Sequence, residues 1–316
     1  MIAMKKALIT GCGGFLGSHL ADFLVARGVD VYGVANEETK NLDQLKGKIK
    51  IISCDISDKE EVENLISDVK PDYVFHLAAQ SFVMVSWKDP EMTFKINILG
   101  TLYILDAIRK AKINPIIEIA CSSAEYGMTH EDEIPITEGK VFRPSSPYAV
   151  SKIATDMIAE LYWKTYKMKI LRIRFFNISG PRKLFDACSD FARGVVEVEN
   201  GIKGKLYTGN IDGTRDITDY RDAIAAMWLL TEKGSYGDVY NVCSGNGYKI
   251  RDIISQLVSM AKTKIVVKEQ DPAKLRPIDD PLFIGDNSKM RKLGWSPKIP
   301  LEQTLKDTLE YWRENL

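Results

Sequence analysis

The sequence predicts an α/β fold: a doubly wound parallel sheet with a smaller, partly interleaved C-terminal lobe. Three observations favour this class. Short apolar runs alternate with amphipathic segments through the first 176 residues, as in parallel sheets joined by crossover helices. A glycine-rich loop follows the first apolar run. Beyond residue 177 the alternation loosens into charged loops between helical segments, so we expect domains at residues 1–176 and 177–316.

The elements of the first domain follow from apolar runs for strands and from 3.6-residue periodicity for helices. We expect strands at residues 5–10, 30–34, 49–54, 73–77, 116–120 and 170–175. Helices are expected at 18–28, 58–69, 94–112 and 147–167, and in the second lobe at 190–200, 219–233, 250–261 and 301–314. Strands separated by helices indicate a sheet whose functional groups gather at its carboxyl edge.

Composition limits the class of protein. The 316 residues carry 43 basic and 43 acidic side chains, which argues against a nucleic-acid or membrane-surface partner. No apolar run is long enough to cross a bilayer, and the N-terminus does not read as a signal peptide. The five cysteines form no Cys-x-x-Cys pair, which favours reduced core thiols over disulfides or metal ligands. We expect a cytoplasmic protein.

The first strand runs into a loop with glycines at positions 11, 14 and 17, and an amphipathic helix follows. Glycines allow the backbone to turn tightly and approach a diphosphate, and a helix N-terminus offers N–H groups and partial positive charge. A structural turn is the alternative for a glycine loop. The strand–loop–helix context favours a dinucleotide site.

The end of the second strand bears on the choice of dinucleotide. An acidic residue there would accept the ribose hydroxyls of NAD, whereas this chain has Asn36, followed by Glu37 and Glu38. The absence of a carboxylate at the strand tip favours NADP over NAD.

Tyr148 and Lys152 lie four residues apart at the start of a predicted helix, which places them on one face. Tyrosine has a reference pKa of about 10 and transfers protons poorly near pH 7. We expect the Lys152 ammonium, with the positive ring of an oxidised nicotinamide, to lower that pKa. The alternative is an ordinary surface pair on a helix.

The glycine spacing and the Tyr148–Lys152 pair resemble the extended short-chain dehydrogenases/reductases, whose cofactor domain is a Rossmann fold. The resemblance implies that Ser122 completes the catalytic set with Tyr148 and Lys152, with Ser123 as the fallback. It implies cofactor contacts from Gly11, Gly14, Phe15, Leu16, Asn36, Asp55, Ile56, Leu77, Ala78, Ala79, Tyr148 and Lys152. It also implies substrate contacts from Ser123, Glu125, Asn177, Arg215 and Arg276.

Two of these assignments have plain structural alternatives. For Asp55 the alternative is an ordinary turn or helix-capping carboxylate. Arg215 could form a surface ion pair with Asp216 or Asp219 instead of clamping a diphosphate.

Residues 209–219, 239–245 and 271–277 are similar to the nucleotide-sugar branch of these enzymes, in particular to its GDP-sugar members. The 4,6-dehydratases of that branch carry a glutamate two residues beyond the catalytic Ser or Thr. Here that position is Ala124, and Glu125 follows with its side chain expected to point elsewhere.

The resemblance therefore implies reduction of the 4-keto group of a GDP-4-keto-6-deoxy-hexose, with Tyr148 as proton donor. The alternatives are a GDP-mannose 4,6-dehydratase and an NAD-dependent nucleotide-sugar 4-epimerase. The intact catalytic set argues against a silent NAD(P)-binding regulator. A homodimer is expected through the helices at 94–112 and 148–167, the usual pairing surface of this superfamily.

Overall fold

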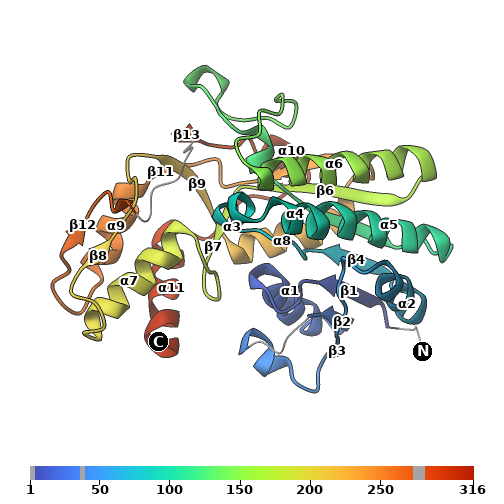
Figure 1. Cartoon of the computed structure of the whole chain (residues 1–316), viewed down its shortest axis with the longest axis horizontal. Helices are drawn as coiled ribbons and strands as arrows, with labels where there is room; N and C mark the ends of the chain where they lie inside the picture. Colours follow the sequence, from blue (N-terminus) through green and yellow to red (C-terminus); the bar gives the residue numbers. More distant parts are fainter. Residues whose placement is uncertain (1–3, 36–39, 273–281) are drawn as a thin grey trace. The chain divides into compact units, whose positions relative to one another are not determined.

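The computed structural model describes residues 4–35, 40–272 and 282–316, which fold into two compact units (Figure 1). The first consists of Met1–Gly127, Val141–Phe175 and Ile224–Tyr240. The second consists of Met128–Lys140, Phe176–Ala223 and Asn241–Leu316. The chain therefore leaves and re-enters the first unit, and each unit is built from segments distant in sequence.

The first unit is organised on a seven-stranded sheet with the order β10-β6-β5-β4-β1-β2-β3. Its strands are β1 (Lys6–Thr10), β2 (Asp30–Val34), β3 (Lys50–Ile52), β4 (Tyr73–His76), β5 (Ile116–Ser122), β6 (Lys169–Phe175) and β10 (Val239–Val242). β1 pairs in parallel with β2 on one side and β4 on the other. The strand order reverses there, which confirms the predicted doubly wound fold.

β10 is an edge strand that the sequence analysis missed. It is four residues long and lies beyond residue 177, in the part of the chain that we assigned mostly to the second lobe. A run this short carries no periodicity that distinguishes strand from loop.

The helices of this unit begin where side chains can cap them. They are α1 (Phe15–Val25), α2 (Lys59–Val69), α3 (Val83–Lys88), α4 (Pro90–Phe94), α5 (Gly100–Lys110) and α6 (Pro147–Tyr166), with most of α8 (Tyr220–Lys233). The Asp58 side chain accepts from the first-turn amides of α2. Ser146 accepts from Ala149 N at 3.1 Å, and Pro147 occupies the first turn of α6. α6 thereby begins one residue before Tyr148.

The single helix expected at 94–112 is interrupted. A π-helical turn at Lys95–Leu99 separates α4 from α5. This turn directs Asn97 inward, where its side chain donates to Gln80 O at 3.0 Å and to Ser151 Oγ at 2.9 Å. These buried bonds favour the wider turn over a continuous helix.

One apolar core lies beneath α2, α5 and α6, and α5 and α6 run side by side (Figure 1). Ile104, Leu105 and Ile108 of α5 are fully buried, with Ile117 and Ile119 of β5 in the same cluster. Packing of these side chains fixes the helices on the sheet, and with them the residues at its carboxyl edge.

The second unit contains short strands that the sequence analysis did not predict. They are β7 (Asn177–Ser179), β8 (Leu206–Tyr207), β9 (Thr214–Asp219), β11 (Gly247–Lys249), β12 (Val267–Lys268) and β13 (Leu282–Phe283). β9 pairs with β7, β11 and β13. The predicted helices are present as α7 (Ala187–Glu199), α9 (Ile250–Ser259) and α11 (Leu301–Asn315), and a short α10 covers Ser288–Lys292.

All five cysteines are buried with free thiols, as the sequence analysis expected. Over the described ranges, no helix combines the length and the apolar character needed to cross a membrane.

Glu118 of β5 is a buried acid in the core of the first unit. It is 1% exposed, and its Oε1 accepts from Thr231 Oγ1 at 2.7 Å. Oε2 has no hydrogen-bond partner among the described residues. Burial raises the pKa of this carboxyl well above its ordinary value of 4.5. The folded protein therefore holds a proton that the unfolded chain releases.

We predict that Glu118→Gln stabilises the protein more at pH 8 than at pH 5. Below about pH 4.5 both states of the wild type bind the proton. As pH rises toward the pKa of Glu118 in the folded state, the free energy of unfolding of the wild type falls by up to about 1.4 kcal/mol per pH unit. Chemical unfolding at both pH values measures this, with the exposed Glu302→Gln of α11 as control. Equal free-energy changes for Glu118→Gln at the two pH values would contradict the prediction.

Candidate active site

The carboxyl end of β5 places a serine at the start of a short helix. Ser122 is the last residue of β5 and the N-cap of the 3-10 helix η3 (Ser123–Tyr126). Its Oγ accepts from Ala124 N at 3.1 Å, and its own amide donates to Glu125 Oε1 at 2.8 Å. Because Ala124 occupies one lone pair, the hydroxyl proton of Ser122 remains available to donate outward.

Tyr148 lies in the first turn of α6 and Lys152 one turn later. The Ser122 side chain lies close enough to the Tyr148 hydroxyl to favour the ionised phenol. Lys152 is 5% exposed, and its Nζ donates to Ala120 O of β5 at 2.6 Å. The structure therefore brings Ser122, Tyr148 and Lys152 together at one strand end.

Burial governs the electrostatics of this group. It raises the pKa of Tyr148 to about 12, against the influence of the Ser122 side chain, and lowers the pKa of Lys152. Lys152 is not among the groups that set the pKa of Tyr148 here, because burial dominates and the ammonium donates to Ala120 O. The expected joint effect of Lys152 and an oxidised nicotinamide ring stays a prediction. A phenol in this state holds its proton at neutral pH. It is suited to donate that proton to an oxygen that gains negative charge.

The Glu125 side chain is buried between β5 and β6, consistent with the expected offset from the dehydratase position but not with a substrate contact. It is fully buried, and its carboxylate is bonded to Ser122 N and lies 3.1 Å from Arg174 Nε of β6. A carboxylate occupied in this way does not face a ligand, so its assignment as a substrate contact is corrected. Ser123, the fallback residue, is 7% exposed as the first residue of η3.

The glycine loop after β1 fits a dinucleotide diphosphate. Gly11 has φ +69°, and a Cβ there would lie 2.8 Å from the backbone of Ala78. A Cβ on Gly17 would lie 2.2 Å from Gly11 O. Gly14 is the N-cap of α1, and Phe15 and Leu16 begin that helix. Only glycines allow β1, α1 and the chain after β4 to approach this closely, leaving the helix N-terminus accessible to phosphate.

The chain after β4 is fixed to the same loop by residues that the sequence analysis missed. Leu77 N donates to Thr10 O, Ala78 N donates to Thr10 Oγ1, and Ala79 follows. His76 bridges Thr10 Oγ1 at 2.8 Å and Thr101 Oγ1 at 3.1 Å. Burial, with a smaller contribution from Lys152, lowers the pKa of His76 to about 3, so it is neutral. No sequence periodicity signals this pairing.

The remaining expected cofactor contacts lie after β2 and β3. Asp55 Oδ1 accepts from Ser57 N at 2.9 Å and from Ser57 Oγ at 2.8 Å, which is the turn geometry of the structural alternative. Ile56 is 6% exposed and packs against the position of Gly100. Asn36 lies outside the described residues.

In the second unit, Asn177 and Arg215 lie on neighbouring paired strands. The Asn177 side chain donates to Asp216 O at 3.1 Å. The Asp216 carboxylate accepts from the backbone amides of Ser244, Gly245 and Gly285. Arg215 and Asp216 alternate along β9, so their side chains lie on opposite faces. Asp216 is thus a structural acceptor rather than an ion-pair partner of Arg215.

Asp219 is likewise engaged, because it pairs with Arg221 at 2.8 Å and accepts from Thr304. Both acidic partners proposed for Arg215 in the structural alternative are therefore held by other groups, and a diphosphate clamp stays a prediction. Arg276 lies outside the described residues.

A cavity of about 450 Å³ in the second unit was missed by the sequence analysis. Its lining combines bases, acids and two aromatic rings: Phe185, Asp190, Arg193, Gly194, Glu197, Lys203, Lys205, Leu206, Tyr207 and Asp271. Glu197 pairs with Arg193 at 3.2 Å and with Lys203 at 2.5 Å. The lysines and Tyr207 are close in sequence, a signal that could have suggested an anionic aromatic ligand.

The parallel sheet, the glycine loop and the Ser122–Tyr148–Lys152 group define an NAD(P)-dependent enzyme of the extended short-chain dehydrogenase/reductase class. Residues 8–308 match the GDP-mannose 4,6 dehydratase family, and the chain belongs to that family.

The chain is 30% identical to GDP-6-deoxy-D-mannose reductase of Pseudomonas aeruginosa, over 99% of this chain and 98% of that protein. It is also 30% identical to GDP-mannose 4,6-dehydratase of Vibrio cholerae, over 95% of this chain and 91% of that protein. Among solved structures, RMD from P. aeruginosa complexed with NADPH has a TM-score of 0.85 and 28% identity, covering 99% of this chain and all of that one. The relatives are nucleotide-sugar enzymes, but reductase and dehydratase are equally similar.

We predict that Tyr148→Phe keeps cofactor affinity but lowers turnover by about 10²-fold or more, because a positioned acid typically contributes 10²–10⁴-fold. Cofactor titration by fluorescence and steady-state kinetics measure the two effects. Tyr166→Phe, at the exposed C-terminal end of α6, is the control. Unchanged turnover in Tyr148→Phe would rule out proton donation by this residue.

We predict that Arg215→Ala raises KM for the nucleotide sugar and leaves KM for the cofactor unchanged. The rise should correspond to a loss of roughly 1.5–3 kcal/mol of binding free energy, as for a lost charged hydrogen bond. The exposed Lys306→Ala of α11 removes one positive charge from the same unit and serves as control. A change confined to the cofactor KM would show that Arg215 binds the other ligand.

Proposed function

We propose that the protein reduces the 4-keto group of a GDP-linked 4-keto-6-deoxy-hexose, converting GDP-4-keto-6-deoxy-D-mannose to GDP-D-rhamnose. The observation that carries this proposal is the site at the end of β5. Ser122, Tyr148 and Lys152 are assembled there, whereas Ala124 stands where a dehydratase has its acid. The neighbouring carboxylate of Glu125 is buried against Ser122 N and Arg174.

The chemistry of reduction needs only the groups assembled there. When bound, the reduced nicotinamide supplies a hydride to C4 of the sugar. Tyr148 transfers its proton to O4 as the C=O bond becomes C–OH, and Ser122 donates a hydrogen bond to the same oxygen. Lys152, held by Ala120 O, places a positive charge beside the phenolate that remains until Tyr148 regains a proton from water.

NADP is the cofactor we favour over NAD. In the sequence, Asn36 stands where an NAD enzyme has a carboxylate, which favours NADP. The NADPH bound to P. aeruginosa RMD supports the same choice. The cradle formed by Gly11 and Gly17 fits the diphosphate of either dinucleotide.

For the substrate, we propose that the lobe formed mainly by residues 177–316 holds the nucleotide diphosphate through Asn177, Arg215 and Arg276. The choice of GDP rests on the names of the relatives from P. aeruginosa and V. cholerae.

A GDP-mannose 4,6-dehydratase is the second candidate, favoured by the family match and by the equal identity to a dehydratase. Dehydration requires a further acid at C6 of the sugar. A methyl group at Ala124 cannot transfer a proton, and Glu125 would have to leave its buried bonds to do so.

We also propose a homodimer formed through α5 and α6. α6 exposes Val150, Met157 and Leu161 along one stripe, with Leu99 exposed just before α5. An apolar stripe on two adjacent helices is suited to pairing with a second copy. A single-chain mass in solution would contradict this.

We predict that the purified protein does not convert GDP-mannose alone into the 4-keto-6-deoxy sugar, but oxidises NADPH when that keto-sugar is supplied by a separate dehydratase. Absorbance at the nicotinamide band and mass spectrometry of the sugar nucleotide measure both reactions.

The matched variants are Glu125→Gln and Tyr148→Phe. Formation of the keto-sugar from GDP-mannose by the wild type, abolished in Glu125→Gln, would overturn the reductase proposal and make Glu125 the dehydratase acid. Interconversion of C4 epimers without net NADPH oxidation would favour an epimerase instead.

A further inference from the structure

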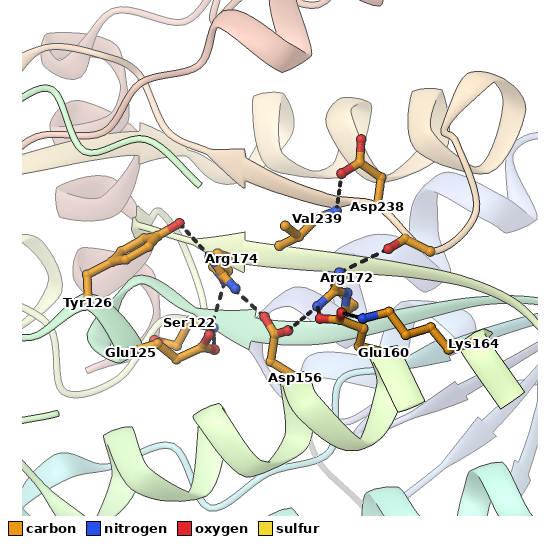
Figure 2. A network of polar contacts seen from close by, with 11 residues as sticks. Ser122, Glu125, Tyr126, Asp156, Glu160, Lys164, Arg172, Arg174, Asp238 and Val239 are labelled. Atoms are coloured by element: carbon orange, nitrogen blue, oxygen red, sulfur yellow. Dashed lines mark hydrogen bonds and ion pairs between the residues drawn. The ribbon is translucent and has the colours of Figure 1, made fainter. Parts of the chain in front are cut away.

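The three catalytic groups of the site come from two different elements. Ser122 ends β5, while Tyr148 and Lys152 lie on α6. Hydride and proton delivery to one carbonyl require the hydroxyl groups of Ser122 and Tyr148 to be held within a fraction of an ångström. The buried polar network of Figure 2 joins these elements through residues to which the proposed reaction assigns no role.

Glu125 is the first part of this connection. Its Oε1 accepts from Ser122 N at 2.8 Å, and the Ser122 hydroxyl in turn accepts from Ala124 N, a reciprocal capping box. Both the backbone and the hydroxyl of Ser122 are therefore fixed by η3. Without the carboxylate, the buried Ser122 amide would lose its acceptor.

Arg174 of β6 is the second part, and Figure 2 shows its guanidinium between Asp156 and Tyr126. Nε lies 3.1 Å from Glu125 Oε2 and 2.9 Å from Asp156 Oδ2. Nη1 donates to the Tyr126 hydroxyl at 3.0 Å. The single hydrogen of Nε is donated to Asp156, so Glu125 Oε2 is held by charge and proximity and accepts no hydrogen bond among the described residues. Because Arg174 is 3% exposed, these charged contacts act in a dry environment where they are strong.

Asp156 is the third part and returns the connection to the catalytic helix. It lies on α6 one turn beyond Lys152 and two turns beyond Tyr148, so the three residues share one face. Its other oxygen accepts from Arg172 Nη1 at 2.5 Å. With both oxygens held by arginines of β6, Asp156 fixes the rotation of α6 against the sheet.

We propose that Glu125 is a positioning residue whose hydrogen bond from Ser122 N and ion pair with Arg174, continued to Asp156, set the Ser122 hydroxyl against Tyr148. This inference rests on the proposed reductase function for its kinetic consequence. The alternative of a cation site at Cys121, Glu125 and Asp156 is not supported, because both carboxylates are already bound by arginine.

The test is a double-mutant cycle of Glu125→Ala and Ser122→Ala, with Glu125→Gln as the conservative variant and the exposed Glu131→Ala as control. We expect Glu125→Ala to lower kcat at least about 10-fold with little change in KM. Glu125→Gln should recover most of kcat, since its amide oxygen still accepts from Ser122 N. The Ser122→Ala/Glu125→Ala double variant should be no slower than Ser122→Ala alone.

The proposal would be overturned if the losses in kcat of the two single variants multiplied in the double variant. It would also be overturned if Glu125→Gln had a normal Tm but did not restore kcat. Hydrogen exchange at the Ser122 amide is read in the same variants without substrate. Glu125→Ala should accelerate this exchange and Glu125→Gln should preserve its protection. If the wild type does not reduce the keto-sugar, the reductase proposal fails, and unchanged Ser122 exchange in Glu125→Ala would still overturn the positioning role independently.

Discussion

Arg174 reaches from β6 to Glu125 of η3, to Asp156 of α6 and to the Tyr126 hydroxyl, and these contacts join every element that bears a catalytic group. Burial lowers the pKa of Arg174, but the charge of Asp156 and its other partners outweighs this and raises it, so it stays charged. Removing one partner of such a buried set leaves an uncompensated charge, which costs more than the intact interaction contributes. The geometry at the end of β5 therefore depends on this set remaining complete.

The same burial determines which chemistry the site favours. It raises the pKa of the Tyr148 phenol and of the Glu125 carboxyl, and it lowers the pKa of the Lys152 ammonium. For Tyr148 this favours the neutral phenol until charge develops beside it, whereas Glu125 already lies beside the charged Arg174. Reduction of a carbonyl places developing negative charge on the oxygen nearest Tyr148 and Ser122. A Tyr148 phenol that holds its proton is suited to the proton donation that the proposed reduction requires.

The sequence predicted the parts of the site that depend on local spacing. The glycine loop, and the Tyr148–Lys152 pair on one helical face, follow from residues within two turns of each other. Glu125 was misplaced because its position is decided by Arg174, which is remote in sequence and buried with it. No periodic pattern in the sequence signals the link from His76 to Thr10 and Thr101. The strands of the second unit are only two to six residues long, too short to show a period. The roles of Asn36 and Arg276 remain predictions from sequence, because both lie outside the described residues.

The central claim is that this chain delivers hydride from added cofactor to C4 of a keto-sugar while Tyr148 protonates O4. The most direct measurement uses NADPH carrying deuterium at both positions of nicotinamide C4, with GDP-4-keto-6-deoxy-D-mannose as substrate and NMR of the product. Reduction predicts one deuterium, bonded to C4 of the sugar. Product without deuterium at C4, or label found at C6, would contradict the claim.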